Sequence, residues 1–218
     1  MLGKLLVISG LSAAGKGTIA NELVKRFDNY VLSVSATTRE KRGNEVDGKD
    51  YFFISRDEFE KMINNGEFLE YANYVNNYYG TPKKYVCEML ERGKNVILEI
   101  EMQGALQVKK LYDKAVLVFF LPKDAKTQRE RLINRNRESL KEVEERIKQA
   151  IVDAEYAKHY DYVLINENVE DSIKDMQLIV DNVYDKSKNK HSLGVLDKIV
   201  SDIKEEQSNV WTIRTRFN

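Results

Sequence analysis

A glycine-rich segment near the start of the chain has the residue types and spacing of a phosphate-binding loop. It reads Gly10-Leu11-Ser12-Ala13-Ala14-Gly15-Lys16-Gly17-Thr18 and follows an apolar run, Lys4–Ser9. Glycines let backbone N–H groups converge, a helix N-terminus adds partial positive charge, and Lys16 adds a full one. A tight strand–turn–helix joint with a surface lysine is the plainer interpretation. The register of strand, glycines, lysine and threonine favours phosphate binding instead.

A second group of chemistry-bearing residues follows the next apolar run. Arg39 and Arg42 lie just beyond Val31–Ser35, in a polar segment that continues to Tyr51. Open α/β sheets bind ligands at the carboxyl ends of their strands, and a guanidinium offers two parallel donors to phosphate oxygens. On charge alone, a solvated loop with basic residues is the favoured interpretation.

The elements that must position these residues alternate along the chain. Short apolar runs without polar alternation predict buried strands of a parallel sheet with helices on both faces. The expected strands are Lys4–Ser9, Val31–Ser35, Asn95–Glu99, Val116–Leu121 and Tyr162–Ile165. The expected helices cover about 17–27, 82–92, 103–112, 125–134, 140–158 and 169–185. Ser139 followed by Glu142 predicts a capping box at the start of one of them.

The interval 36–81 interrupts this alternation. It is rich in Tyr, Asn and Gly, and Tyr51–Ile54 and Phe68–Tyr74 have the character of short strands. Ser55 and Glu58 predict the start of a short helix through Met62. We interpret the interval as a small β-rich lobe inserted into the parallel sheet. Its tyrosines could line a site, or simply fill a small amphipathic sheet.

Composition limits the function further. The 218 residues carry 35 Lys+Arg and 35 Asp+Glu, so net charge gives no general case for binding nucleic acid or an anionic membrane. One cysteine, Cys87, excludes an intramolecular disulfide and fits a reducing compartment; we expect it to be packed or idle. No apolar run approaches the ~20 residues that cross a bilayer. We therefore expect a cytoplasmic α/β protein without a membrane partner.

Further segments make the chain resemble the guanylate kinase family of nucleoside monophosphate kinases. The Gly-Lys-Gly-Thr form of the loop occurs in such kinases, and the resemblance spans about residues 4–186. The other segments that carry it are Ser33–Tyr51, Gly66–Ala72, Asn77–Pro82, Ile97–Ala105 and Tyr162–Asn166. The resemblance implies a core of the phosphate-loop NTPase type, an inserted GMP-binding lobe at about 36–81 and a helical lid at about 125–158. Residues 187–218 form an extension with an amphipathic helix of unknown role.

The resemblance implies transfer of the γ-phosphoryl group of ATP to GMP, in purine nucleotide metabolism. ATP is then expected on Gly10–Thr18. The implied GMP contacts are Ser35, Arg39, Arg42, Tyr51, Glu70, Tyr79, Thr81 and Glu101. An ionised Glu70 could accept from guanine N1–H and N2–H₂ together, whereas adenine would repel it. The hydroxyl of Thr81 could donate to guanine O6.

The resemblance also implies how charge is neutralised during transfer. The expected catalytic residues are Lys16, Arg39, Arg42, Arg135 and Arg146. Relatives often have Arg-Gly where this chain has Arg135-Asn136-Arg137, so the lid arginine could be Arg135 or Arg137. For Arg131, an ordinary solvated helix charge is the favoured interpretation. Mg²⁺ is expected with ATP, near Thr18 and Glu99, without a cluster of protein ligands.

Two other functions are open. Another nucleoside monophosphate kinase, acting on adenine, is disfavoured by Glu70 and Thr81. A kinase-like interaction module without catalysis is disfavoured by the intact Lys16 and Thr18. The sequence leaves the oligomeric state open, and ATP and GMP are the expected partners.

Overall fold

A computed structural model describes residues 2–74, 76–134 and 139–216, and the chain divides into two compact units. The first unit comprises Met1–Ile8 and Ala20–Leu117. The second comprises Ser9–Ile19 and Val118–Asn218. Arg135 and Arg137 lie outside the described residues. Each unit contains parallel strands and helices, which confirms the predicted α/β class.

Parallel strands form the core of the first unit. β1 (Leu5–Gly10) pairs with β7 (Asn95–Glu99), which also pairs with β2 (Tyr30–Leu32). The register aligns Leu5 with Val96 and Tyr30 with Asn95. Residues Leu5 to Ile8 are at most 1% exposed, as a strand covered on both faces requires. α1 (Lys16–Arg26), α3 (Lys83–Glu91) and α4 (Met102–Leu111) follow β1, β6 and β7 in the chain.

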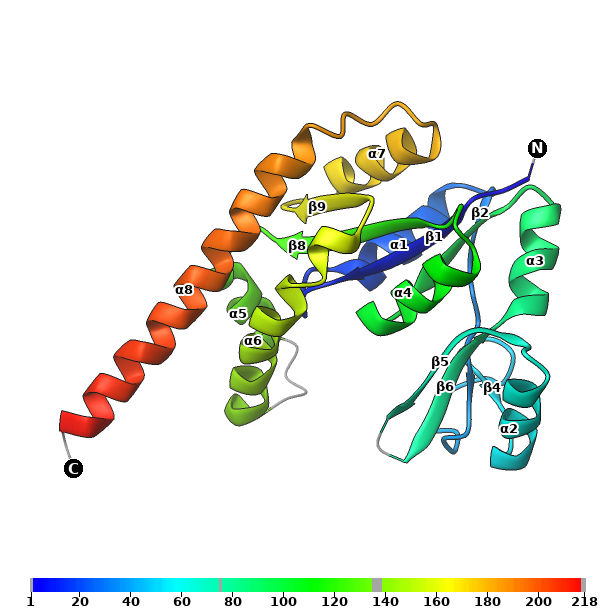
Figure 1. Cartoon of the computed structure of the whole chain (residues 1–218), viewed down its shortest axis with the longest axis horizontal. Helices are drawn as coiled ribbons and strands as arrows, with labels where there is room; N and C mark the ends of the chain where they lie inside the picture. The colour runs from blue at the N-terminus through cyan, green and yellow to red at the C-terminus, as the bar shows by residue number, and fades with distance from the viewer. Residues whose placement is uncertain (1, 75, 135–138, 217–218) are drawn as a thin grey trace. The chain divides into compact units, whose positions relative to one another are not determined.

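A second, four-stranded sheet lies within the predicted inserted lobe. Its order is β4 (Phe52–Phe53), β3 (Ala36–Thr37), β6 (Asn77–Pro82) and β5 (Phe68–Tyr74). Figure 1 shows β5 and β6 as a long hairpin near α2 (Arg56–Asn64). The Ser55 side chain accepts a hydrogen bond from the Glu58 N–H, as predicted for this helix start. Phe59 stacks on Phe68 and Tyr78 and forms a small core of its own.

Two predicted strands are shorter in the structure. The predicted strand at Val31–Ser35 ends at Leu32, because Ser33 to Ser35 lead into the lobe, where the Ser35 carbonyl accepts from Phe52 N–H. The predicted strand at Tyr51–Ile54 is reduced to Phe52–Phe53, since only two residues pair with β3.

The second unit holds β8 (Val116–Pro122) and β9 (Tyr162–Asn166), which pair in parallel from Val118 onward. Its helices include α5 (Ala125–Asn134), α6 (Leu140–Ala154) and α7 (Val169–Val180). The predicted capping box at Ser139 is present in full. α6 ends four residues before the predicted 158 and gives way to a 3₁₀ turn, Ala157–His159. α7 ends before the predicted 185 because Asn182 takes a left-handed conformation, with φ +60°.

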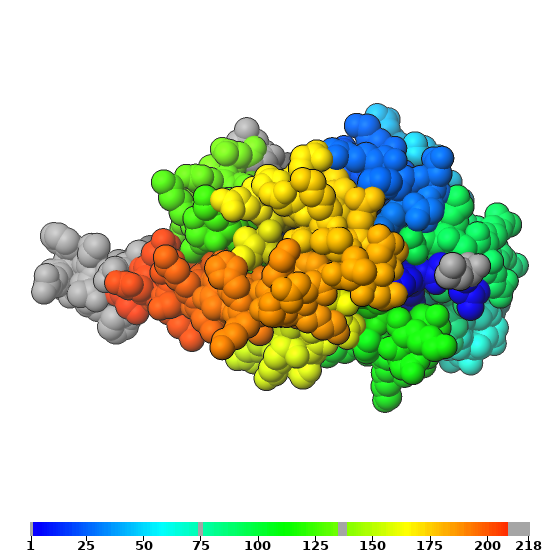
Figure 2. Space-filling view, turned by 90° about the horizontal axis from the view of Figure 1, so that it is seen from above, coloured from blue at the N-terminus to red at the C-terminus, as the bar shows by residue number. Residues whose placement is uncertain are grey.

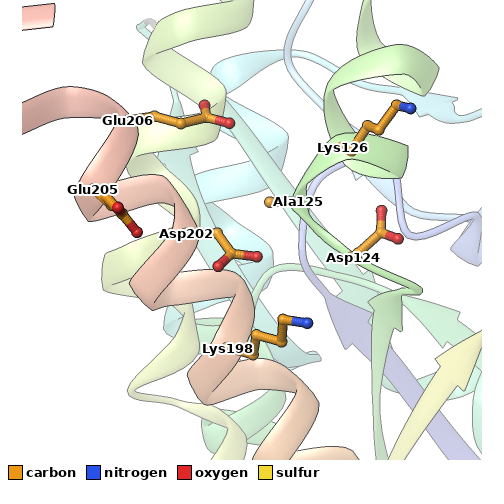
Figure 3. A pocket seen from close by; sticks show the side chains of 7 residues that line it. All are labelled: Asp124, Ala125, Lys126, Lys198, Asp202, Glu205 and Glu206. Atoms are coloured by element: carbon orange, nitrogen blue, oxygen red, sulfur yellow. The ribbon is translucent and has the colours of Figure 1, made fainter. Parts of the chain in front are cut away.

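A long C-terminal helix, α8 (Lys188–Arg216), runs past β9, α5 and α6 (Figure 1). Leu196, Ile199 and Ile203 are buried, which confirms the amphipathic spacing. Figure 2 shows its orange surface lying against the yellow surface of the second unit. Glu206 accepts from Arg129 of α5 at 2.6 Å, and Figure 3 shows Glu206 on α8 opposite the start of α5. The same arginine donates to Glu144 of α6, so one guanidinium links three helices.

Cys87 lies on α3 and is exposed, which contradicts the packed alternative of the prediction and leaves the idle one open. It borders a largely apolar cavity of about 670 Å³ together with Phe52, Ile54 and Met62 of the lobe. The part of the chain that the structure describes contains no helix with the length and hydrophobicity of a membrane span.

Candidate active site

The predicted phosphate loop connects β1 to α1, and its backbone depends on glycine. Gly10 has φ +143°, and a Cβ there would lie 2.1 Å from the Phe120 carbonyl oxygen. Gly15 has φ +86°, and a Cβ there would lie 2.3 Å from Nδ2 of Asn166. Ala13 takes the left-handed conformation with φ +62°, at an energetic cost that its surroundings must offset. The conformation of the loop therefore requires glycine at positions 10 and 15.

Side-chain donors hold the carbonyl groups of this loop. Nζ of Lys16 donates to the Gly10 and Leu11 oxygens at 2.9 and 3.1 Å. The next three carbonyls accept one bond each. Ser12 accepts from Gln128 Nε2 at 3.1 Å, Ala13 from Arg131 Nη1 at 3.5 Å and Ala14 from Asn166 Nδ2 at 2.8 Å. Five successive carbonyls are thus tied to side chains. Beyond them α1 begins at Lys16, and the N-terminus of a helix favours an anion.

A cavity of about 410 Å³ adjoins this loop within the second unit. Its lining comprises Ala13, Gly15, Thr18, Arg131, Asn134, Asn166, Glu167, Asn168 and Val169. Arg131 also donates to the Asn166 carbonyl at 3.3 Å, so it contacts the loop and β9. This placement contradicts the favoured interpretation of Arg131 as a solvated helix charge. Arg146, an expected lid arginine on α6, reaches the Ser12 hydroxyl at 3.4 Å.

A buried acid–hydroxyl pair lies in the lobe of the first unit. Glu70 on β5 is 7% exposed and faces Thr81 on β6, whose hydroxyl donates to Glu70 Oε1 at 2.6 Å. Burial raises the pKa of Glu70, and hydrogen bonds from Thr81 offset part of that shift. The other oxygen, Oε2, would lie 2.7 Å from a Cβ at Gly104, so any larger residue at that point of α4 requires the Glu70 carboxylate to move.

The predicted phosphate-binding arginines differ in their surroundings. Arg39 donates from both terminal nitrogens to Glu45, at 3.1 and 2.8 Å, and lies over the Tyr51 ring. Tyr51 and Tyr79 are edge-to-face, with ring centroids 6.1 Å apart. The bonds that Arg39 donates to Glu45 raise the pKa of Arg39, and burial raises the pKa of the Tyr51 phenol. Arg42 is exposed, and its backbone N–H donates to Glu45 at 2.8 Å.

The remaining residues that were predicted to contact the nucleotide or Mg²⁺ are more exposed to solvent. Ser35 is half-buried where β2 leads into the lobe, while Glu99 and Glu101 are exposed at the end of β7 and the start of α4. The structure therefore brings Arg39, Tyr51 and Tyr79 together and pairs Glu70 with Thr81. It does not place the Arg42 side chain in that group.

Sequence reasoning missed three residues of these sites. Gln128 and Asn166 hold the loop, and Gly104 makes room for Glu70. A glycine in the first turn of a helix was the available signal for Gly104, because glycine weakens helices and usually has a reason there. Nothing in the spacing of Gln128 or Asn166 distinguishes them from ordinary polar residues.

The described residues contain no group of three or more His, Cys, Asp or Glu side chains arranged to hold a metal ion. The hydroxyl of Thr18, in the first turn of α1 and on the cavity wall, is an oxygen ligand of the kind Mg²⁺ prefers. This donor set fits a Mg²⁺ held mainly by nucleotide phosphates.

A phosphate loop at a helix N-terminus beside parallel strands defines a nucleotide-binding protein of the phosphate-loop class. The sequence profile described as guanylate kinase matches residues 2–183. The guanylate kinase of Clostridioides difficile is 47% identical over 94% of this chain and 97% of its own length, and that of Carboxydothermus hydrogenoformans is 48% identical over 82% and 87%. A crystal structure of guanylate kinase from Anaplasma phagocytophilum matches with a TM-score of 0.64 and 32% identity, over 86% of this chain and 89% of that one. The chain belongs to the guanylate kinase family and is a phosphotransferase.

Proposed function

We propose that this chain transfers the γ-phosphoryl group of ATP to GMP, with the donor on the Gly10–Thr18 loop and the acceptor in the lobe around Glu70. The observation that carries the choice of acceptor is the buried Glu70–Thr81 pair. Burial makes a lone carboxylate costly, so an ionised Glu70 gains from a ligand with two adjacent N–H donors. Guanine offers N1–H and N2–H₂ on one edge, while adenine presents an acceptor at N1.

Thr81 orients the carboxylate in this proposal. Its hydroxyl proton is directed at Glu70 Oε1, so the predicted bond to guanine O6 is replaced by a bond that fixes the Glu70 side chain. Oε2 then remains beside Gly104 at the start of α4, where the helix N-terminus favours negative charge.

Arg39, Tyr51 and Tyr79 would bind the acceptor phosphate. A guanidinium and two phenols provide donors matched to phosphate oxygens. GMP phosphate would compete with Glu45 for Arg39, which exchanges one charge-assisted pair for another. Arg42 and Ser35 would join when the nucleotide is bound, and Glu101 would contact the base.

Catalysis would rest on positioning and on neutralising charge, because the transition state of phosphoryl transfer is loose and spreads charge over oxygens. Lys16 would exchange its loop carbonyls for donor phosphates. Arg131 and Arg146 contact the loop and would neutralise charge there. Arg135, which lies outside the described residues, would contribute to this neutralisation. Mg²⁺ bound with ATP would lower the charge of the phosphates, and the Thr18 hydroxyl would supply an oxygen ligand to it. This chemistry requires no covalent intermediate.

We also propose a guanylate kinase-like domain at 1–186, with the lobe at about 36–81 and the lid at about 125–158, followed by the extension at 187–218. The extension corresponds to α8 and lies beyond the family match, which ends at residue 183. A cytoplasmic location is proposed because the one cysteine, Cys87, is an exposed free thiol that suits a reducing compartment.

The test is a phosphate-transfer assay with magnesium–ATP and each of the four common ribonucleoside monophosphates. We expect GMP to exceed AMP in kcat/KM by about 10⁴, because a site built on buried hydrogen bonds rejects ligands that leave them unpaired. Similar efficiencies for GMP and AMP would reject guanine recognition. Absence of transfer to every acceptor, with ATP bound normally, would favour a non-catalytic module.

A further inference from the structure

Gln128 is a fully buried amide that sits against the phosphate loop. It belongs to α5, is 0% exposed, and donates from Nε2 to the Ser12 carbonyl at 3.1 Å. Its other polar atom, Oε1, is buried and has no hydrogen-bond partner among the residues that the structure describes. A buried acceptor without a partner is unfavourable, and an apolar side chain of similar size would avoid that cost. The amide at this position therefore contributes chiefly through its bond to Ser12.

Ser12 is a sensitive point of the loop. It precedes Ala13, whose left-handed conformation is unfavourable for a residue with a Cβ and persists only when its neighbours are fixed. The carbonyls on either side of Ala13 are both held, Ser12 by Gln128 and Ala14 by Asn166. The Asn166 amide is itself oriented by the Ser172 hydroxyl, which donates to its Oδ1 at 3.0 Å. Two buried amides thus bracket the strained residue.

Holding a carbonyl also sets the N–H groups of the loop, because each peptide unit is planar and its C=O and N–H point in opposite directions. Fixing the Ser12 carbonyl toward α5 turns the N–H of Ala13, in the same peptide unit, to the other side. Preset N–H groups bind an anion without the entropic cost of ordering the loop at that moment.

We infer that Gln128 is a positioning residue for the donor nucleotide: its amide holds the Ser12 peptide so that the loop is ready for the ATP phosphates. This inference rests on the proposed function, since it takes the loop as the ATP site. Gln128 acts through Ser12 and is not assigned a contact with the substrate.

The experiment uses the full chain with Gln128→Met, which keeps the length of the side chain and removes both polar atoms. We expect ATP to bind about three- to tenfold more weakly, the range for losing one hydrogen bond. The dissociation constant of GMP should not change. The melting temperature should stay the same or rise, because the unpartnered Oε1 is gone. Gln177→Met, the same change at a half-buried position on α7 of the second unit, is the matched control and should leave the binding of ATP and GMP unchanged.

Direct binding of ATP and of GMP, measured separately by calorimetry, distinguishes the possible failures. A wild-type chain that does not bind ATP would reject the proposed function. A wild type that binds ATP and a Gln128→Met variant that binds it equally well would reject only the role of Gln128. Equal weakening of ATP and GMP binding, or unfolding of both Gln128→Met and Gln128→Leu, would make Gln128 a purely structural residue and overturn the inference.

Discussion

The phosphate loop and the lobe around Glu70 differ in which groups bind the ligand. In the loop, the binding groups are backbone amides, and the side chains of Lys16, Gln128, Arg131 and Asn166 serve to hold carbonyls. In the lobe, the binding groups are side chains, and they already pair with one another, Arg39 with Glu45 and Glu70 with Thr81. The backbone of the loop is thus prepared for a ligand, and only Lys16 among its groups must change partners, whereas every binding pair of the lobe must be exchanged for a ligand pair. Substitutions in the loop should therefore affect the donor, and substitutions in the lobe should affect the acceptor.

Lys16→Ala is expected to give the largest loss. It removes a cation that contacts two loop carbonyls and that would bind the donor phosphates. Transfer should fall more than a hundredfold, or about 2.7 kcal/mol, while the circular dichroism spectrum stays unchanged. Lys25→Ala, at an exposed lysine of the same helix, is the control. A Lys16→Ala enzyme that kept over a tenth of wild-type turnover would remove the loop lysine from the mechanism.

Glu70→Gln should change the acceptor and spare the donor. The new amide would present N–H groups to the N–H groups of guanine, and losing a bond to a charged group costs roughly 1.5–3 kcal/mol. The efficiency with GMP should fall about ten- to a hundredfold, while ATP affinity stays unchanged. Glu67→Gln, at an exposed carboxyl before β5, is the control. Unchanged discrimination between GMP and AMP would assign specificity to other groups.

The pH dependence of kcat/KM for GMP should reflect the raised pKa of the buried Glu70 carboxyl. Burial raises the pKa of this carboxyl above its usual 4.5, and the ionised form is the one that accepts from guanine. The kcat/KM for GMP should therefore fall as pH decreases, starting above the usual glutamate range. The folded protein holds this proton more tightly than the unfolded chain, so this group favours folding more at acid pH than at neutral pH. The acid limb should be missing from the Glu70→Gln profile.

Gly104→Ala should separate activity from stability in the lobe. The added Cβ would lie 2.7 Å from Glu70 Oε2 and 3.3 Å from its Cδ, so the carboxylate must move. GMP efficiency should fall about tenfold, while alanine favours the helix by up to ~1 kcal/mol. Thermal unfolding measured beside the GMP kinetics checks both parts. Gly194→Ala on α8, where a Cβ meets nothing within 4 Å, is the matched control. Full activity in Gly104→Ala would show that Glu70 tolerates displacement.

Arg39→Lys should have a smaller effect than the changes above, and Arg42→Lys the smallest of all. A lysine cannot reproduce the two parallel bonds that Arg39 makes with Glu45 and would make with phosphate. We expect GMP to bind about fivefold more weakly to Arg39→Lys and about twofold more weakly to Arg42→Lys, whose guanidinium is exposed. The effect is larger for Arg39 because Arg39→Lys loses one charge-assisted bond at an enclosed position, whereas Arg42 is exposed. If calorimetry gave the same GMP affinity for both variants and the wild type, these arginines would be ordinary charges of a solvated loop.

Much of the fold could be predicted from the sequence because periodicity and turn residues are local signals. The strand Asn95–Glu99 and the capping box at Ser139 agree with the prediction residue by residue. The ends of α6 and α7 could not be predicted, since a left-handed Asn182 and a terminal 3₁₀ turn depend on local packing. In the loop, Lys16 is visible from its motif. Gln128 is not, because its role depends on a bond to a residue 116 positions away.

The exposed thiol of Cys87 has a practical consequence for optical measurements. It is the only cysteine in the 218 residues, so a thiol-reactive fluorophore would attach at one place without any residue being replaced. That place borders the apolar cavity formed with Phe52, Ile54 and Met62 of the lobe. Emission from such a dye depends on the polarity around it, so the natural chain can carry its own reporter of rearrangements in the lobe, read in real time.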